Sequence, residues 1–397
     1  MPTPRRVINA KGPATVLGGA RASAPVIDAV TAAMRDSVHI PELQGHVGAE
    51  VAKLLGAESA FVTGCAAAGM SIAVAAAVGG DDLAQVTSLP KPSHPRTEVV
   101  IQKGHMIIVG GCNADQVIRL GGGTPVEVGT AADCTDFQLA AAIGPNTAAG
   151  LFVDGERARG SGMLNLRDFA RLCHDHGVPV IVDAAGSTAV AEFLRDGADL
   201  VIVSAHKWLR GPTAGIVAGR ADLVHAAYLH SEFGVGRPMK AGKEGVAGVL
   251  AAVRAAEAGD DSARAQTERA VAANIVDQLA GLAGLTVREV PTEHESTAVT
   301  TVRIDVDPAL ANIQAWQLAD ATEAMDPSVA LYDYEAAQGY LLIDPGFLDD
   351  GDDEIIAAAI RQVHERAQAE PFDIAEAPAP RFATLVERVQ NWRTTGS

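Results

Sequence analysis

Aromatic residues are scarce in this sequence: Phe, Trp and Tyr together make up 4% of the 397 residues. Hydrophobic residues as a group reach 48%, and glycine alone occurs 40 times. Large aromatic clusters are therefore excluded, and we expect small side chains to pack closely between helices and a sheet. A chain of this length is expected to bury a large core and to add a second, smaller domain.

Cysteine is also rare, with four residues, Cys65, Cys112, Cys134 and Cys173, none of them in a C-x-x-C pair. The histidines likewise show no metal-like spacing, so we expect no metal site. The first residues, MPTPRRVINAKGP, have two arginines but no apolar run behind them, which does not fit a signal peptide. We therefore expect reduced thiols in a cytoplasmic protein.

Positive charge is in the minority, because 31 Lys and Arg face 49 Asp and Glu, a net charge of -18. No stripe of Lys or Arg interrupts this excess, which argues against a nucleic-acid partner. The most apolar long segment, 66–78, is rich in Ala and Gly and too short to span a bilayer. We therefore expect neither nucleic acid nor membrane as a partner.

What the sequence does contain is a central stretch, 178–220, with three short apolar runs at 178–182, 200–203 and 215–218. Each run is bounded by Gly, Asp or Pro, as expected for strands buried on both faces of a parallel sheet. Strands and helices alternate elsewhere, which predicts an α/β fold with a doubly wound, mostly parallel sheet. Further strands are expected at 61–63, 98–102, 117–120, 125–128 and 149–153, and helices at 24–37, 42–55, 166–176 and 245–258.

The composition changes near residue 284, which predicts three parts: an N-terminal arm (1–20), a large domain (21–283) and a small C-terminal α+β domain (284–397). In the last part we expect strands at 285–290, 298–304 and 339–343, helices at 313–325 and 353–369, and a short helix at 381–392.

An acid and a lysine stand at the ends of neighbouring strands in the central stretch. Asp183 ends the first run, and Lys207 follows the second inside the segment SAHKW. Open α/β sheets bind ligands at the carboxyl ends of their strands. The pair predicts a site for pyridoxal 5'-phosphate, with Lys207 forming the Schiff base and Asp183 keeping the pyridine nitrogen protonated. Singly, Asp183 could be a helix cap and Lys207 a surface lysine.

A turn of small residues, Gly64, Cys65 and Ala66, leads from a predicted strand into a helix. Its backbone N–H groups could hold the cofactor phosphate, although a simple tight turn has the same sequence signature. Ser204 and His206 are further candidates for the phosphate, with a structural hydrogen bond as the alternative for His206.

His105 follows a predicted strand and could lie on one face of the cofactor ring, with Ala185 on the other face. Arg237, Lys240 and Lys243 form a basic group in a Gly-rich loop of an otherwise acidic chain. A solvated turn would explain this loop, but we favour binding of a phosphate or carboxylate.

Several segments resemble fold-type-I pyridoxal-phosphate enzymes, in particular the group that includes selenocysteine synthase and D-glucosaminate-6-phosphate ammonia-lyase. The similarity covers about residues 5–365 and is most specific in HKWLRGP and GRPMKAGKE; the other segments are VINAKG, VTGCAAAG, VVIQKGH and VPVIVDAAG. The resemblance implies a mostly parallel, seven-stranded-type sheet with a smaller C-terminal domain. It also implies a homodimer or higher homo-oligomer with shared active sites, and the roles already given to Lys207, Asp183 and His105.

The chain departs from this group in three places. Ala205 and His206 replace the usual Gly-Gly before the lysine, Arg21 replaces a Ser of the N-terminal arm, and apolar residues follow His105. These changes approach the substrate side, so the sequence does not predict a sugar-phosphate substrate. Arg21 joins the basic loop as a candidate ligand for substrate or phosphate.

These observations predict a pyridoxal-phosphate-dependent lyase acting on a β-hydroxy or β-substituted amino acid. Lys207 would remove the Cα proton, the β-substituent would leave, and a 2-oxo acid and ammonia would be released. A racemase, aminotransferase or retro-aldolase would use the same groups and break another Cα bond. A non-catalytic scaffold is disfavoured because Lys207 is present, and a dehydrogenase because no G-x-G-x-x-G motif follows the first strand.

Overall fold

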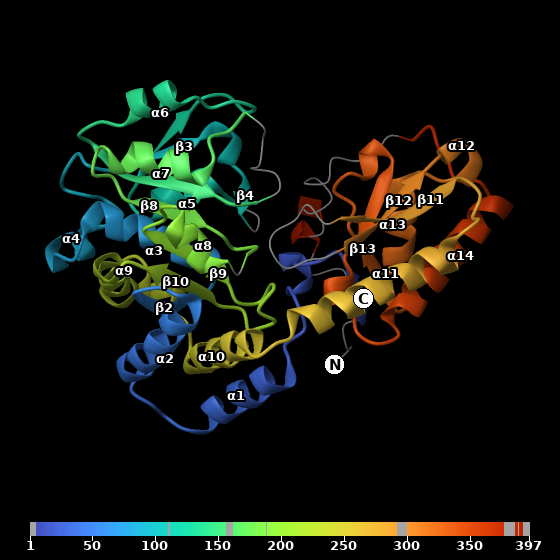
Figure 1. Cartoon of the computed structure of the whole chain (residues 1–397), viewed down its shortest axis with the longest axis horizontal. Coiled ribbons are helices and arrows are strands. Elements are labelled where there is room, and N and C mark those ends of the chain that lie inside the picture. Colours follow the sequence, from blue (N-terminus) through green and yellow to red (C-terminus); the bar gives the residue numbers. More distant parts are fainter. Residues whose placement is uncertain are drawn as a thin grey trace. The chain divides into compact units, whose positions relative to one another are not determined.

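The computed structural model describes residues 5–109, 112–155, 162–187, 189–291, 300–376, 386–387 and 389–391. They form two compact units (Figure 1). The large unit contains residues 18–259, and the C-terminal unit contains residues 5–17 together with the described residues from 260 onward.

The large unit is built on a seven-stranded sheet with the order β2-β10-β9-β8-β7-β3-β6. In chain order its strands are β2 (Ser59–Thr63), β3 (Glu98–Gln102), β6 (Thr124–Val128), β7 (Thr147–Val153), β8 (Val180–Asp183), β9 (Leu200–Ser204) and β10 (Gly215–Gly219). The prediction of an α/β fold with a mostly parallel sheet is confirmed. One strand differs from the expectation, because β10 runs antiparallel to both β2 and β9.

Side chains on alternate positions of each strand enter different cores. In β9, Val201 and Val203 join the core on one face, and Leu200 and Ile202 join the core on the other. One face is covered by α3 (Ala66–Gly79), α4 (Leu83–Ser88), α5 (Ala114–Leu120) and α9 (Ala221–Phe233). The other is covered by α1 (Ala24–Arg35), α2 (Ile40–Leu55), α6 (Asp136–Ala142), α7 (Leu166–His174), α8 (Val190–Arg195) and α10 (Lys243–Glu257).

The expected strand at 117–120 is wrong, because these residues belong to helix α5. Asn113 caps this helix in a capping box with Gln116, whose side chain accepts the Asn113 N–H at 3.0 Å. The β-branched pair Val117 and Ile118 suggested a strand, but both side chains pack on the core side of a helix. The Asn-x-x-Gln spacing was the sequence signal for the helix start. A short hairpin, β4 (Ile108–Val109) with β5 (Cys112–Asn113), precedes it.

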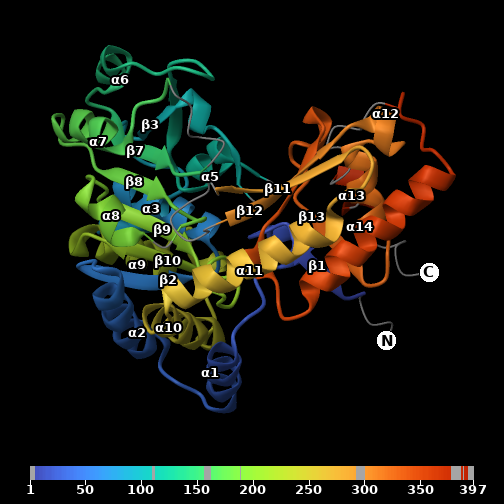
Figure 2. The same ribbon diagram turned by 45° about the vertical axis from the view of Figure 1, so that its right-hand side comes forward.

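The C-terminal unit has a three-stranded antiparallel sheet of β11 (Leu285–Pro291), β12 (Thr300–Val306) and β14 (Tyr340–Ile343). A second pair joins β1 (Val7–Ala10) to β13 (Ser328–Leu331), neither of which the sequence predicted as a strand. The helices of this unit are α11 (Asp261–Leu279), α12 (Pro308–Ala311), α13 (Ala315–Glu323) and α14 (Asp352–Ala369). Helices α11 and α14 lie side by side (Figure 2).

The division between the units follows Gly259, whereas the sequence analysis expects it at 283/284. Helix α11 accounts for the difference, since Ala272, Ile275 and Leu279 enter the core of the C-terminal unit. The helix expected at 381–392 lies largely outside the described residues. None of the four cysteines forms a disulfide. Within the described ranges, no helix combines the length and the apolar character needed to cross a membrane.

Candidate active site at the carboxyl edge of the sheet

Four neighbouring strands of the large unit bring the central candidates to one edge of the sheet. β3, β7, β8 and β9 are hydrogen-bonded in that order and run parallel. Their carboxyl ends therefore lie together, with His105 beyond β3, Asp183 at the end of β8 and Lys207 beyond β9. The register aligns Val153 of β7 with Asp183. Residues separated by about a hundred positions in the sequence thus meet at one place.

Asp183 is a buried carboxylate, with 4% of the residue exposed. Its Oδ1 accepts the Ala185 N–H at 3.1 Å. Burial raises the pKa of Asp183, the positive charge of Lys207 and the Ala185 N–H lower it, and the charge of Asp154 adds to the rise. Lys207 itself is half-buried in the turn after β9. A carboxylate in this position gains from any further cation that approaches it.

Ser204 and His206 are both buried at the end of β9 and the following turn. The Ser204 Oγ and His206 Nδ1 atoms are 3.4 Å apart. Burial, followed by the charge of Lys207, lowers the pKa of His206, so the neutral ring is favoured. When Nδ1 accepts the Ser204 hydroxyl, the proton of the neutral ring is on Nε2. This buried Nε2 has no hydrogen-bond partner among the described residues, so it is free to donate to a ligand.

The turn of Gly64, Cys65 and Ala66 connects β2 to the first turn of α3. Thr63 Oγ1 donates to the Cys65 carbonyl at 2.7 Å, and the Ala68 N–H donates to Cys65 Sγ at 3.4 Å. The Gly64 N–H is taken by the Met239 carbonyl at 3.0 Å. The amides at the start of α3 have no intrahelical acceptor, so they face an anion with the positive end of the helix.

Gly64 has a steric reason to be glycine. A Cβ at this position would lie 2.6 Å from the Met239 carbonyl oxygen. The loop that contains Met239 therefore passes directly over the turn, and Thr63 forms a bridge with Lys240. This contact places the backbone of the basic loop against the proposed phosphate turn.

The basic residues of this loop are partly engaged within the chain. Arg237 forms an ion pair with Glu232 at 3.2 Å, and Lys243 Nζ donates to the Asp36 carbonyl. The side chain of Lys240 is exposed and has neither an ion pair nor a hydrogen bond with a described residue. Of the three candidates, Lys240 is the one most available to an external anion.

His105 is anchored at the edge of the sheet by its neighbours. Its Nδ1 accepts the Val153 N–H at 3.1 Å, and its ring packs against Phe152 with centroids 4.6 Å apart and planes at 88°. Gln102 sits beside it, with Oε1 accepting the Leu164 N–H at 2.8 Å. The residue is 1% exposed. That it stacks on a cofactor ring stays a prediction, as does the contact of Ala185 with the other face.

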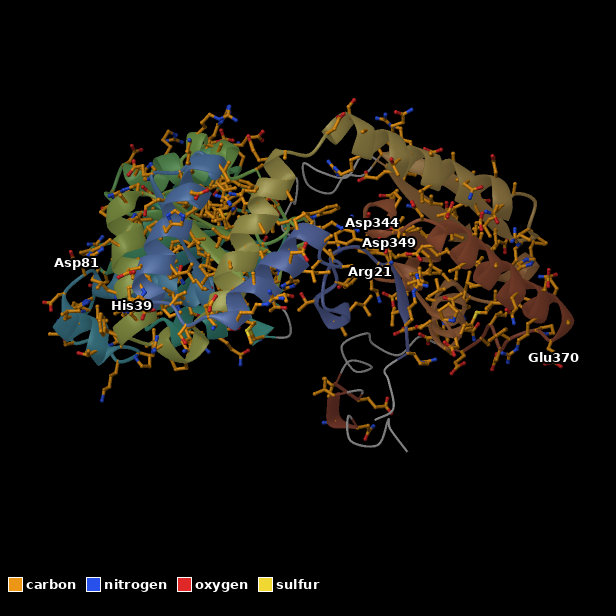
Figure 3. The ribbon with its side chains drawn as sticks, turned by 90° about the horizontal axis from the view of Figure 1, so that it is seen from below. Arg21, His39, Asp81, Asp344, Asp349 and Glu370 are labelled. Atoms are coloured by element: carbon orange, nitrogen blue, oxygen red, sulfur yellow. The ribbon has the colours of Figure 1, made fainter. Side chains whose placement is uncertain are left out.

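Arg21 lies on a segment that runs along the lysine turn, which we define as residues 205–211. The Ala20 N–H donates to the His206 carbonyl at 2.7 Å, and the Ser23 N–H donates to the Arg210 carbonyl at 3.4 Å. Figure 3 labels Arg21 on this segment, which we call the N-terminal linker (18–23). The sequence analysis assigned the first part of the linker to an extended arm and did not foresee this contact.

Two residues that the sequence analysis did not single out also belong to this edge. The Asp154 N–H donates to the Asp183 carbonyl at 2.8 Å, which places a second carboxylate beside the first. Gln102 orders the strand end next to His105. Both stand one residue from the end of a predicted strand, and that position was the available signal. Within the described ranges, no group of His, Cys, Asp and Glu could hold a metal ion.

The residues at this edge fit pyridoxal phosphate. The free Nε2 of the buried His206 and the start of α3 are suited to a phosphate, and buried Asp183 is suited to a protonated ring nitrogen. Lys207 provides the amine between them in sequence and within electrostatic range of both Asp183 and His206. Chemically, this arrangement can hold an aldehyde cofactor and stabilise negative charge that develops at the carbon of a bound amine.

Comparisons with known proteins agree with this geometry. Residues 7–262 match the family model described as L-seryl-tRNA selenium transferase (SelA). The 5'-C-glycyluridine monooxygenase-decarboxylase of Streptomyces sp is 38% identical over 352 residues, which is 88% of each chain. The D-glucosaminate-6-phosphate ammonia lyase of Salmonella typhimurium is 32% identical over 363 residues, covering 91% of this chain and 96% of that one.

The structural comparison gives the same group. The solved structure of D-glucosaminate-6-phosphate ammonia-lyase superposes with a TM-score of 0.83 and 31% identity, covering 92% of this chain and 97% of that chain. The fold is that of the pyridoxal-phosphate-dependent enzymes of fold type I.

Proposed function

This chain belongs to the L-seryl-tRNA selenium transferase (SelA) family, and on that basis we propose that it is a pyridoxal-phosphate-dependent lyase of a β-hydroxy or otherwise β-substituted amino acid. The observation that carries the proposal is the meeting of Asp183, His206 and Lys207 at one edge of the sheet. The relative named as an ammonia lyase supports elimination as the reaction.

The chemistry that pyridoxal phosphate supplies when bound is an aldehyde that joins amines covalently and a ring that accepts electron density from Cα. Lys207 is the residue that would hold the aldehyde. When a substrate amine takes its place, the released Nζ is a base positioned to remove the Cα proton. The lysine turn is closed by the Arg210 N–H to Lys207 carbonyl bond of 3.0 Å, which limits the movement of the lysine backbone.

Asp183 would stabilise positive charge on the ring nitrogen. Its carboxylate is buried, and burial raises its pKa, so pairing with a cation recovers free energy that desolvation costs. The Ala185 N–H fixes the position of Oδ1. This fixed negative charge favours the flow of electrons from Cα into the ring, as elimination requires.

The phosphate would be held by the helix start after Cys65 together with Ser204 and His206. The neutral His206 ring donates from Nε2, the hydroxyl donates from Ser204, and the first amides of α3 add partial positive charge. Lys240 is the cation nearest in the fold to this turn through its backbone bridge with Thr63. Arg21, Arg237 and Lys243 remain candidates for the anionic groups of the substrate.

The net reaction removes a β-hydroxyl with the Cα proton as water, and hydrolysis of the product gives a 2-oxo acid and ammonia. A second candidate is oxygen-dependent decarboxylation, which the 38% identity to a monooxygenase-decarboxylase favours. It would use the same cofactor site but break the bond from Cα to the carboxylate. A racemase, aminotransferase or retro-aldolase would differ again only in the bond that is broken.

We also propose that the protein is a cytoplasmic homodimer or higher homo-oligomer in which neighbouring subunits share active sites. The four free thiols and the family resemblance support this part of the proposal.

Absorbance spectroscopy tests the proposal. Purified protein incubated with pyridoxal phosphate is expected to show a visible band that borohydride bleaches and fixes covalently to Lys207. Lys207→Ala is expected to lack both the band and the fixation while keeping the wild-type circular dichroism spectrum. A wild-type protein without the band would refute the proposal.

A panel of D- and L-amino acids then separates the reactions. Elimination releases equal amounts of ammonia and 2-oxo acid with or without oxygen. Decarboxylation releases carbon dioxide and consumes oxygen, so activity that disappears under argon supports the second candidate. Oxo acid that appears only in the presence of an amino acceptor would indicate an aminotransferase and contradict the lyase.

A further inference from the structure

Arg210, three residues after Lys207, has an unusual backbone conformation. Its φ is 50°, in the left-handed region that favours glycine. Among the described non-glycine residues, the other with a positive φ is Asn312 (57°), which ends helix α12. Asparagine is well tolerated at such a helix end, but arginine has no comparable local compensation. The side chain at this position therefore costs stability that glycine would not.

The conformation is held by hydrogen bonds of the lysine turn and its neighbour. The Arg210 N–H donates to the Lys207 carbonyl at 3.0 Å, and the Gly211 N–H donates to the Ala205 carbonyl at 2.8 Å. The Arg210 carbonyl accepts the Ser23 N–H of the N-terminal linker at 3.4 Å. These bonds require a left-handed residue at 210 whatever its side chain is. Strain of this kind is concentrated at functional sites.

The chemistry of an amino acid substrate indicates what the side chain does. Such a substrate always has a carboxylate, which a guanidinium binds through two parallel hydrogen bonds. Arg210 is half-buried and its N–H contacts the carbonyl of Lys207, so its side chain starts within reach of a molecule bound to that lysine. Arg237 and Lys243 already interact with Glu232 and Asp36.

We propose that Arg210 is a specificity-determining residue that binds an oxyanion of the substrate beside Lys207, and that its backbone strain is the cost of keeping a guanidinium where the turn favours glycine. The inference rests on the proposed function, because it requires an amino acid bound at Lys207. The oxyanion is the α-carboxylate, with a phosphate on the substrate side chain as the other source of the same chemistry.

Thermal unfolding of three variants, without cofactor, tests the strain. Arg210→Gly is expected to raise Tm by about 1–3 °C, because it removes the strain. Arg210→Lys keeps the strain and is expected to unfold within about 1 °C of the wild type. Asn312→Gly is the matched control, with an expected change smaller than that of Arg210→Gly. A fall in the Tm of Arg210→Gly would show that the side chain stabilises the fold, and would overturn the inference.

Substrate binding is measured on the cofactor-loaded protein as the change in its visible absorbance. The probes are D- and L-serine, serinamide, which lacks the carboxylate, and O-phosphoserine. In Arg210→Gly the Kd for serine is expected to rise about 10-fold or more, with that for serinamide unchanged. Arg210→Lys is expected to show a smaller rise, and Asn312→Gly none. A loss confined to O-phosphoserine supports the inference with phosphate as the oxyanion.

Two results would contradict the inference in different ways. If Arg210→Gly binds serine and O-phosphoserine as the wild type does, the inference is wrong while the proposed function stands. If the wild type shows no visible band with pyridoxal phosphate, the proposed function fails and the inference fails with it.

Discussion

At the scale of single residues, the site depends on polar groups that are buried and incompletely paired. Asp183 is removed from water and has one backbone N–H donor and the charge of Lys207 to offset the cost. His206 is neutral and has a ring nitrogen without a partner among the described residues. Both groups cost free energy in the isolated chain, and both gain when a ligand with complementary charge is bound.

Asp183→Asn tests the role of this negative charge. The amide oxygen can still accept the Ala185 N–H, so the fold and the visible band are expected to persist. Lyase turnover is expected to fall roughly 100-fold or more, because a neutral amide cannot stabilise a protonated ring nitrogen. Asp183→Glu, which keeps the charge, is expected to retain more activity than Asp183→Asn. Equal activity of wild type and Asp183→Asn would exclude the assigned role.

Asp344 of the C-terminal unit, labelled in Figure 3, makes stability depend on pH. Burial raises its pKa from 3.8 to about 7; the Gly346 N–H opposes the rise, Glu268 adds to it and Arg264 opposes it. Between about pH 4 and pH 7 the folded chain therefore keeps a proton that the unfolded chain loses. The free energy of unfolding is expected to fall across this window by up to about 4 kcal/mol from this group.

Denaturant unfolding of wild type and Asp344→Asn at a series of pH values measures this contribution. The variant is expected to show a shallower fall in stability than the wild type between pH 4 and pH 7. Asp350→Asn, an exposed acid six positions further along the chain, is the control and is expected to follow the wild type. Parallel curves for wild type and Asp344→Asn would contradict the prediction.

At the scale of elements, the N-terminal linker and the lysine turn form one local unit. Gly18 and Gly19 both have left-handed φ values, 83° and 77°. A Cβ on Gly19 would lie 2.2 Å from the His206 carbonyl oxygen, whereas a Cβ on Gly18 would meet no atom within 4 Å. The linker can therefore approach the lysine turn only because position 19 has no side chain.

Gly19→Ala is expected to displace the lysine turn and weaken the binding of pyridoxal phosphate about 10-fold or more, measured by absorbance titration. Gly18→Ala has a similar backbone penalty, of about 1 kcal/mol, but no collision, and is the matched control. It is expected to bind the cofactor as the wild type does. Equal cofactor affinities for the two variants would show that the linker does not position the turn.

At the scale of the whole molecule, the net charge of -18 opposes self-association, because two copies repel each other. The proposed homodimer must overcome this repulsion, which salt screens over about 8–10 Å at physiological ionic strength. Light scattering after size-exclusion chromatography is expected to give at least twice the chain mass at about 0.15 M salt. The fraction of dimer is expected to decrease as salt is lowered. A monomer at all salt concentrations would contradict shared active sites.

The sequence alone determined the fold class and the residues at the centre of the site. Short apolar runs bounded by Gly, Asp and Pro identify β8 and β9 because buried strands must be apolar on both faces, and the acid and lysine follow directly in the chain. Such signals are local, so they can be read without coordinates. The same locality made 117–120 ambiguous, since a short β-branched run fits a strand as well as a helix.

Tertiary structure decided everything that depends on contacts between distant segments. It reversed the direction of β10, paired β1 with β13, and laid the N-terminal linker against the lysine turn. It also set the left-handed backbone of Arg210, which no local signal in the sequence predicts. Strand direction, register and backbone strain are set by hydrogen bonds between partners far apart in the chain, and a linear pattern contains no record of which partners meet.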